Sequence, residues 1–306
     1  MHATAPIPAR AVTAAAAFAV GALALTACGS TAPKVSSESL HDKLPAKIRD
    51  AGVLKIASDI NYAPVEFKGQ DGAATGIDPD LAQAIGKRLG VKVEFEDTAF
   101  DKAIPGLQAK EFDAVMSAMT DNRTRRDGTD ADGKQVNPGV DFVDYLIVGT
   151  SILVPKGNPA KIAKLDDLCG NTVAIQRGTT QADIVDRQTA ACARSHKPLT
   201  VKLFENDTQA LAEVAAGHAD ADMNDLPVAA YLASKGGPGG SKFEVAGPQL
   251  QPAPYGIAVA KDNTDLRDAL VKAINQMIRD GEYDTILAKW GVSAAAVQSA
   301  VVNGGF

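Results

Sequence analysis

Short apolar runs alternate with helix-forming segments along most of the chain, and this alternation restricts the fold more than any other feature. Val53–Ala57 and Val91–Phe95 have the composition and length of strands. Between them, apolar residues recur every four positions over 81–89, and Gly90 follows as a helix stop. Further strands are expected at Ala114–Met116, Val173–Ile175, Val201–Leu203 and Asp220–Met223. Strands separated by helices predict an α/β fold with mostly parallel sheets flanked by helices.

Two segments could carry the chain from one sheet to another. The apolar run Tyr145–Val154 is longer than a typical strand. A second candidate, Pro252–Ala260, follows a Gly/Pro-rich loop at 236–240. The body of the chain, 44–306, is long enough for two domains of roughly 100–150 residues each. The last part, 266–290, is expected to form two helices broken at Asp280-Gly281.

The N-terminal segment has the pattern of an export signal. Arg10 is followed by the apolar run Ala11–Ala27, which is too short and too rich in Ala and Gly for a typical membrane span. Leu25-Thr26-Ala27-Cys28 resembles the lipobox of bacterial lipoproteins, in which the Cys is acylated and becomes the mature N-terminus. This predicts a signal peptide at 1–27 and a polar tether at 28–43, lipid-anchored at the extracellular face of the cytoplasmic membrane. An ordinary cleaved signal, in which Cys28 has no role, is the alternative.

Charge and cysteine content narrow the possible functions. The formal net charge is −6 and there is no dense run of Lys and Arg, so nucleic acid is not expected as a partner. With Cys28 used for lipid, an exported compartment favours a disulfide between Cys169 and Cys192. Two buried free thiols are the alternative. The chain has no CxxC motif and its four His are scattered, so neither a metal site nor a cofactor is expected.

Several motifs resemble one known family. They are Gly76-Ile77-Asp78-Pro79-Asp80-Leu81, Asp113–Ser117, Gly178-Thr179-Thr180, Asp280-Gly281-Glu282-Tyr283 and Lys289-Trp290-Gly291. In this order, from about Ala46 to Gly291, they resemble the bacterial extracellular solute-binding proteins of family 3, which serve ABC importers of polar amino acids. Pro79 departs from the family pattern, which usually has an aliphatic residue there.

The resemblance implies a two-lobed fold that closes on its ligand like a flytrap. The chain would cross between lobes twice, with one lobe formed by 44–148 and 252–306 and the other by 149–251. The implied function is high-affinity binding of a polar, possibly cationic, L-amino acid by a monomer, and delivery to the permease subunits of an ABC importer.

A buried zwitterion needs a fixed cation for its carboxylate and a fixed anion for its ammonium, because burying either charge unpaired costs several kcal/mol. In open α/β sheets such groups gather past the carboxyl ends of strands. Four candidate groups follow expected strands: Asp59, the segment Ser117–Thr120, Thr179-Thr180 and Asp225.

The resemblance assigns roles to these groups. Arg125 would bind the ligand carboxylate bidentately, although Arg123 and Arg126 are nearby competitors and a solvated turn is the alternative. Thr180 would add its hydroxyl and backbone N–H, unless it is only a helix cap. Asp225 would bind the ammonium, unless it only caps the helix that follows. Ser117, Thr120 and Thr179 would line the same end of the pocket, and Ala118 replaces a Ser of some relatives.

Recognition of the ligand side chain stays open. Tyr62 and Phe100 match pocket positions and could sandwich the side chain, although core packing is the alternative. Asp59 matches a position that holds a cationic side chain in some relatives, or it could be a structural turn residue. Arg177, beside Thr179, would instead favour an acidic side chain.

Other functions are less well supported by the sequence. A few relatives of this fold are dehydratases of small carboxylates, but the chain has no His beside a candidate Ser and no metal cluster, so no enzyme is expected. A solute-sensing receptor component would need a kinase, channel or transmembrane region after the lobes. A cell-wall lyase would need a further catalytic domain.

Overall fold

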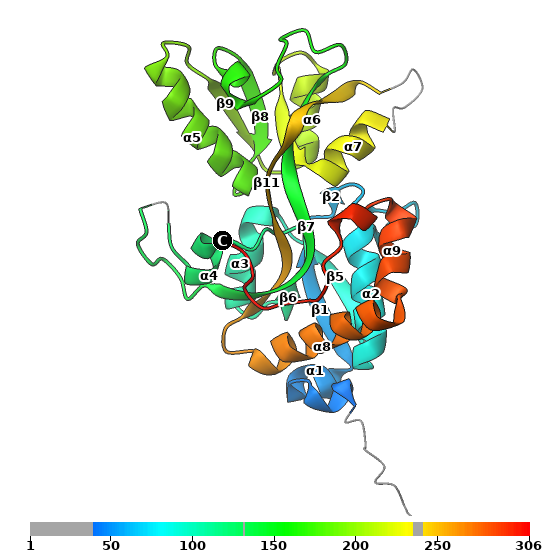
Figure 1. The fold of residues 1–306 in the computed structure, drawn as a ribbon. Coiled ribbons are helices and arrows are strands. Elements are labelled where there is room, and N and C mark those ends of the chain that lie inside the picture. The colour runs from blue at the N-terminus through cyan, green and yellow to red at the C-terminus, as the bar shows by residue number, and fades with distance from the viewer. Residues whose placement is uncertain (1–38, 131, 235–240) are drawn as a thin grey trace, which may run out of the picture. The chain divides into compact units, whose positions relative to one another are not determined.

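The computed structural model describes residues 39–130, 132–234 and 241–306 (Figure 1). The expected signal peptide at 1–27, Cys28 and most of the tether at 28–43 lie outside the described residues, as does the loop at 236–240. The end of the expected tether is described: Leu40–Lys43 form a short 3-10 helix, η1, and Leu40 packs against the core. Within the described ranges, none of the helices has the length and apolar character that a membrane crossing requires.

The first group of elements, lobe 1, comes from both ends of the described chain. Its central strand β1 (Val53–Ser58) pairs in parallel with β5 (Lys92–Asp97) and with β6 (Ala114–Val115). Helix α2 (Ile77–Leu89) buries its apolar face in the core and ends where Gly90 takes a left-handed conformation, φ 69°. The other elements are α1 (Ala46–Ala51), β2 (Asn61–Tyr62), β3 (Glu66–Lys68), β4 (Ala74–Thr75), α3 (Phe100–Gln108), α4 (Arg123–Asp127), α8 (Thr264–Asp280), α9 (Glu282–Trp290) and η3 (Ser293–Ala295).

The middle of the chain forms lobe 2, which has a core of its own. Strands β8 (Thr172–Gln176) and β9 (Thr200–Phe204) pair in parallel, and a bridge from Val173 to Ala221 joins β8 to the segment just before β10 (Asp222–Asp225). Apolar side chains of these strands pack with those of α5 (Thr180–Arg194). The other elements are η2 (Leu165–Leu168), α6 (Asp207–Ala215) and α7 (Leu226–Ser234).

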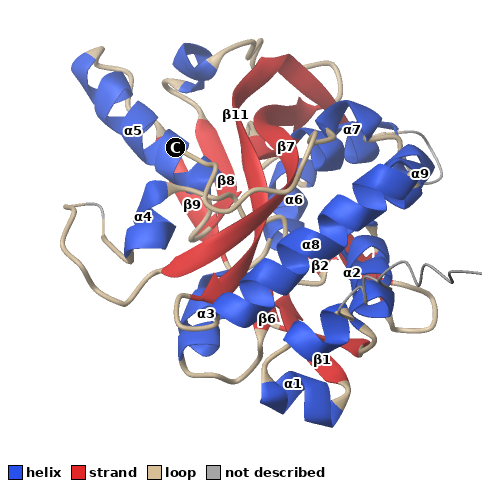
Figure 2. Ribbon diagram, turned by 60° about the horizontal axis from the view of Figure 1, so that its bottom comes forward, coloured by secondary structure: helices blue, strands red, loops and turns tan. Residues whose placement is uncertain are grey.

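Two long antiparallel strands, β7 (Val140–Pro155) and β11 (Phe243–Ala260), link the lobes (Figure 1). They join one sheet in the order β10-β7-β11-β6-β1-β5, and helices lie on both sides of the strands (Figure 2). Both expected crossings lie in these strands, and the expected boundaries after 148 and 251 fall inside them. The α/β, two-lobed fold is confirmed. The large sheet is mixed, because β7 and β11 add antiparallel pairs to the parallel ones.

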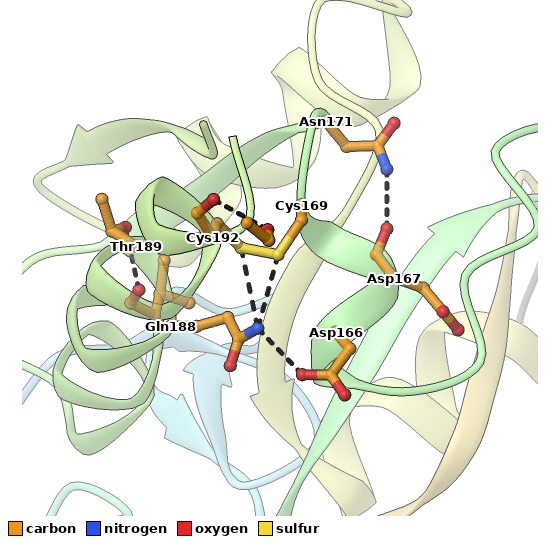
Figure 3. Close-up of a disulfide and its surroundings, with 9 residues drawn as sticks. Asp166, Asp167, Cys169, Asn171, Gln188, Thr189 and Cys192 are labelled. Carbon is orange, nitrogen blue, oxygen red and sulfur yellow. Dashed lines mark hydrogen bonds between the residues drawn. A yellow bond between two sulfur atoms is a disulfide. The ribbon is translucent and has the colours of Figure 1, made fainter. Parts of the chain in front are cut away.

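The expected disulfide is present in lobe 2 (Figure 3). It joins Cys169, just after η2, to Cys192, in the last turns of α5. Gln188, one helical turn before Cys192, points its amide at both sulfur atoms and at Asp166 (Figure 3). The disulfide therefore ties α5, whose first turn reaches the site described next, to the rest of its lobe.

Candidate ligand-binding site

A cavity lies between the lobes and is lined by side chains of both. Lobe 1 contributes Asp59, Tyr62, Glu66, Phe100, Ser117, Ala118, Thr120 and Arg125, and lobe 2 contributes Gln176, Thr179, Thr180, Gln181 and Asp225. All nine residues that the sequence predicts for the site are in this set. Glu66, Gln176 and Gln181 are additions to that expectation.

Strand ends bring these side chains together. Asp59 follows β1 directly, Ser117 follows β6, and Gln176 and Asp225 are the last residues of β8 and β10. Because side chains past the carboxyl ends of parallel strands collect at one edge of a sheet, segments far apart in the sequence reach one cavity.

Arg177 does not lie on the cavity, although its neighbour Gln176 does. Successive side chains of an extended segment point to opposite sides. Arg177 is exposed, and its Nε donates to the carbonyl oxygen of Phe204 at 3.3 Å. The interpretation in which Arg177 selects an acidic ligand side chain therefore has no support from the position of this residue.

Arg125 is held with its guanidinium at the cavity wall. Its backbone N–H donates to the Asn122 side chain, which caps α4. Nη1 donates to the carbonyl oxygen of Thr120 at 2.7 Å, and Nη2 reaches across to the carbonyl oxygen of Gly178 in lobe 2 at 3.0 Å. The guanidinium lies 5.3 Å from the centre of the Phe100 ring. Loss of hydration lowers the pKa of Arg125 to about 10, so the group stays positively charged at neutral pH.

The two competing arginines are engaged elsewhere. Arg123 is exposed and pairs with Asp127 in the same helix, at 3.1 Å. Arg126 pairs with the fully buried Asp121 at 2.7 Å. Of the three arginines in α4, Arg125 alone lines the cavity.

Asp225 provides a buried anion on the lobe 2 side, with 5% of its surface exposed. Gln181 Nε2 donates to its Oδ1 at 2.7 Å, and the Tyr62 hydroxyl of lobe 1 donates to Oδ2 at 3.1 Å. Burial raises the pKa of Asp225 to about 6, against the lowering effect of the Tyr255 and Tyr62 hydroxyls, Arg125 and Gln181. The Asp225 carboxylate is therefore hydrogen-bonded to two side chains of the cavity wall, and the residue directly precedes α7 in the sequence.

Asp59 provides a second buried carboxylate, also 5% exposed. Asn61 Nδ2 donates to its Oδ1 at 2.9 Å, and Gln176 Nε2 of lobe 2 donates to Oδ2 at 2.7 Å. Burial raises the pKa of Asp59, and these two amides oppose the shift. Asp59 in lobe 1 and Asp225 in lobe 2 therefore place a buried carboxyl group on each side of the cavity.

The hydroxyl groups have different roles. Thr120 and Thr180 face each other across the lobes, with their Oγ1 atoms 3.2 Å apart. Thr179, and not Thr180, is the N-cap of α5, since its Oγ1 accepts from Ala182 N at 3.0 Å and donates to Gln176 O at 2.9 Å. The Thr180 hydroxyl donates to Gln181 Oε1 at 3.2 Å, and its side chain lines the cavity.

Two further carboxyl groups, Glu66 and Asp78, help to hold the cavity wall in place: Glu66 lines the cavity, and Asp78 is fully buried. Ser117 Oγ donates to Glu66 Oε1 at 3.0 Å, and Asp78 accepts from Ala118 N at 3.0 Å and from the Tyr145 hydroxyl at 2.7 Å. Burial raises the pKa of Asp78 to about 7 and that of Glu66 well above its usual range. A shared proton avoids two like charges in one buried site. The bond to Asp78 holds the backbone N–H of Ala118, a residue in a left-handed conformation with φ 46°.

The sequence matches the bacterial extracellular solute-binding proteins, family 3, over residues 54–293. The arginine-binding protein ArgT of Corynebacterium glutamicum is 30% identical over 262 residues, which cover 85% of this chain and 81% of that one. A solved ancestral arginine-binding protein bound to arginine is 36% identical, with a TM-score of 0.69, covering 78% of this chain and 98% of that one.

A further solved structure is the ancestral amino acid-binding protein AncCDT-1, described as a precursor of cyclohexadienyl dehydratase. It is 36% identical, with a TM-score of 0.68, and the match covers 80% of this chain and 97% of that one. The family match spans most of the described residues and includes every residue of the cavity. The chain belongs to family 3 of the bacterial extracellular solute-binding proteins.

Proposed function

We propose that the protein binds a cationic L-amino acid in the cavity between its lobes and delivers it to the permease of an ABC importer. The observation that carries the proposal is the charge of the cavity wall. Arg125, Asp225 and Asp59 all line one cavity to which both lobes contribute.

The balance of charges favours a ligand with a net charge of +1. The ligand carboxylate would pair with Arg125 and its ammonium with Asp225, as a zwitterion requires. Burial raises the pKa of Glu66 well above its usual range, which favours the protonated, uncharged form of this group. Asp59 would then remain as a buried charge without a cation, which is costly. A cationic side chain supplies that missing partner, and two of the similar proteins are described as arginine-binding.

Delivery would rest on closure of the lobes around the ligand. Arg125 and Asp59 belong to lobe 1, whereas Asp225 belongs to lobe 2, so a ligand that contacts all three joins the lobes. Such a ligand shifts the protein towards the closed arrangement by its higher affinity for that state. The nine predicted site residues would serve as ligand contacts or as supports of such contacts.

The proposal includes the expected anchor. Acylation at Cys28 would hold a monomer at the outer face of the cytoplasmic membrane through the tether at 28–43. A Cys28→Ser variant should appear in the culture medium or as an unprocessed precursor, whereas the wild-type protein should fractionate with membranes. Equal membrane association of both proteins would contradict the anchor.

An enzyme is the second candidate, because of the similarity to AncCDT-1. Protonated Glu66 is the acid that the cavity wall offers, and its carboxyl is engaged by Ser117. No His is among the residues that line this cavity. We propose binding without turnover.

A screen of the twenty amino acids by thermal shift, followed by calorimetry, tests the function. Ligands stabilise the fold by mass action, and we expect one-to-one binding of a cationic amino acid with a Kd in the micromolar range or tighter, about −8 kcal/mol or better. Mass spectrometry of the incubated ligands should find them unchanged. Affinity only for sugars, metals or peptides would contradict the proposal, and product formation would favour the enzyme.

A further inference from the structure

Gln176 occupies a distinctive position in the cavity wall. It is the last residue of β8, only 7% exposed, and it lines the cavity beside Asp59. Its Nε2 donates to Asp59 Oδ2 at 2.7 Å and to the carbonyl oxygen of Glu205 at 3.2 Å. Both amide hydrogens of Gln176 are therefore used.

These two neighbours fix the orientation of the amide. A carboxylate oxygen and a backbone carbonyl oxygen can only accept hydrogen bonds, so a flipped amide would place Oε1 against two acceptors. Oε1 therefore points away from them. Among the hydrogen bonds that the described residues form, none is donated to Gln176 Oε1. This oxygen is not one of the fully buried side-chain atoms that lack a partner, and Gln176 lines the cavity, so a donor from a ligand can reach the oxygen there.

Asp59 has unused acceptor capacity at the same place. Asp59 accepts hydrogen bonds from the side-chain amides of Asn61 and Gln176 and from the backbone N–H of Phe100, and a carboxylate has about four lone-pair sites. The wall near Asp59 thus presents acceptors from both lobes: the carboxylate of Asp59 and the amide oxygen of Gln176. A guanidinium, with five N–H groups in a planar fork, can serve both acceptors at once, whereas an ammonium is a compact point charge.

The other glutamine of the cavity shows a contrasting arrangement. Gln181 Nε2 donates to Asp225 Oδ1 at 2.7 Å, and its Oε1 accepts from the Thr180 hydroxyl at 3.2 Å. Both polar ends of Gln181 are bonded to protein groups. The two glutamines therefore differ in whether the amide oxygen is available to a ligand.

We propose that Gln176 is a specificity-determining residue, which selects a ligand ending in a guanidinium over one ending in a primary ammonium. This rests on the proposed function, since it assumes that the ligand side chain points to Asp59. A bound ligand would shield the amide oxygen of Gln176 from water. A ligand that offers this oxygen no N–H group would therefore bind more weakly. Among cationic amino acids, Gln176 would thus favour those with a guanidinium group over those with a primary ammonium.

Calorimetric titration of the mature protein with L-arginine and L-lysine tests the proposal, using Gln176→Leu and the matched variant Gln181→Leu. Wild type should prefer arginine by roughly tenfold or more. Gln176→Leu should weaken arginine binding by roughly tenfold or more and lysine binding much less, so the preference should collapse. Gln181→Leu should weaken both ligands by a similar factor, because it acts on Asp225, near the ammonium that both ligands share.

The ratio of the two affinities separates a specificity role from a structural one. An unchanged ratio in Gln176→Leu, or a wild-type protein without preference for arginine, would overturn the proposal. If circular dichroism shows that Gln176→Leu does not fold, Gln176→Met takes its place in the same comparison. Failure of the wild-type protein to bind any amino acid would instead refute the proposed function. This outcome differs from an unchanged affinity ratio, which refutes only the role of Gln176.

Discussion

Tyr62 and Asp225 come from different lobes and share two hydrogen bonds. The Tyr62 hydroxyl donates to Asp225 Oδ2 at 3.1 Å and accepts from the Asp225 backbone N–H at 2.8 Å. Together with the contacts from Gln176 to Asp59 and from Arg125 to Gly178, this joins the lobes at the cavity itself. Residues that would bind the ligand are thus also residues that hold the lobes together.

The first prediction concerns this contact. Tyr62→Phe removes the hydroxyl and leaves the Asp225 N–H without its acceptor. Ligand affinity, measured by calorimetry, should fall by roughly tenfold, because a hydrogen bond to a charged group is worth about 1.5–3 kcal/mol. The melting temperature without ligand should fall only modestly, because Phe keeps the ring that packs against the core of lobe 1, although the Asp225 N–H loses its acceptor. Wild-type affinity in Tyr62→Phe would show that the contact does not contribute to the bound state.

The second prediction compares two arginines of one short helix. Arg125→Ala should weaken binding by a factor of tens to thousands, because truncating one member of a buried charged pair costs about 2–5 kcal/mol. Arg123→Ala should bind within about twofold of wild type, since the exposed pair of Arg123 with Asp127 contributes little. If both variants lost the same amount of ligand affinity, the overall positive charge of α4 would matter and not a specific contact of Arg125.

The third prediction concerns pH. The pKa of Asp225 is raised to about 6 by burial, and the ligand ammonium needs the ionised form. Affinity should therefore be constant above pH 7 and weaken below pH 6, by about tenfold between pH 7 and pH 5. The raised pKa of Asp59 acts in the same direction. Affinity that stays constant down to pH 5 would contradict the role of these carboxylates.

The raised pKa of Asp225 has opposite effects on ligand affinity and on folding stability as the pH falls. The folded pKa of Asp225 lies above its unfolded value of about 3.9, so this group favours the folded state most at low pH, and that contribution is lost as pH rises through about 6. Weaker binding at pH 5 should therefore not come from unfolding through Asp225. Circular dichroism at both pH values is the control.

The fourth prediction concerns the disulfide. Cys169→Ala/Cys192→Ala should lower the free energy of unfolding by about 2–4 kcal/mol, because the bond restricts the unfolded chain. Neither cysteine lines the cavity, so ligand affinity should stay close to that of wild type. Denaturant titrations with and without a reductant, on wild type and variant, provide the measurement. A variant as stable as oxidised wild type would contradict the prediction.

The strands and the order of the main elements were accessible from the sequence, because hydrophobic periodicity and stop signals reflect burial directly. The small sheet of β2, β3 and β4 was not accessible, since strands such as Asn61–Tyr62 and Ala74–Thr75 are too short to show a period. The mixed character of the large sheet was missed for another reason. The relative direction of β7 and β11 depends on the path of the chain between the lobes, and no local sequence pattern indicates that path.

The site could be predicted where charge and position coincide. Asp59 and Asp225 were found because charged groups at strand ends stand out. Gln176 also ends a strand and obeys the same rule, but an uncharged amide gives a weaker signal. Glu66 was missed because its role depends on Ser117, which is distant in sequence and reaches it only in the folded chain.

Calorimetric titration of the mature protein with L-arginine and with its neutral isostere L-citrulline tests the central claim most directly. The two ligands share the α-ammonium, the α-carboxylate and nearly the same shape, and differ in the charge that would face Asp59. A cavity with a surplus carboxylate should bind arginine in the micromolar range or tighter and citrulline at least tens of times more weakly. Equal affinity for the two, or binding of neither, would contradict the account.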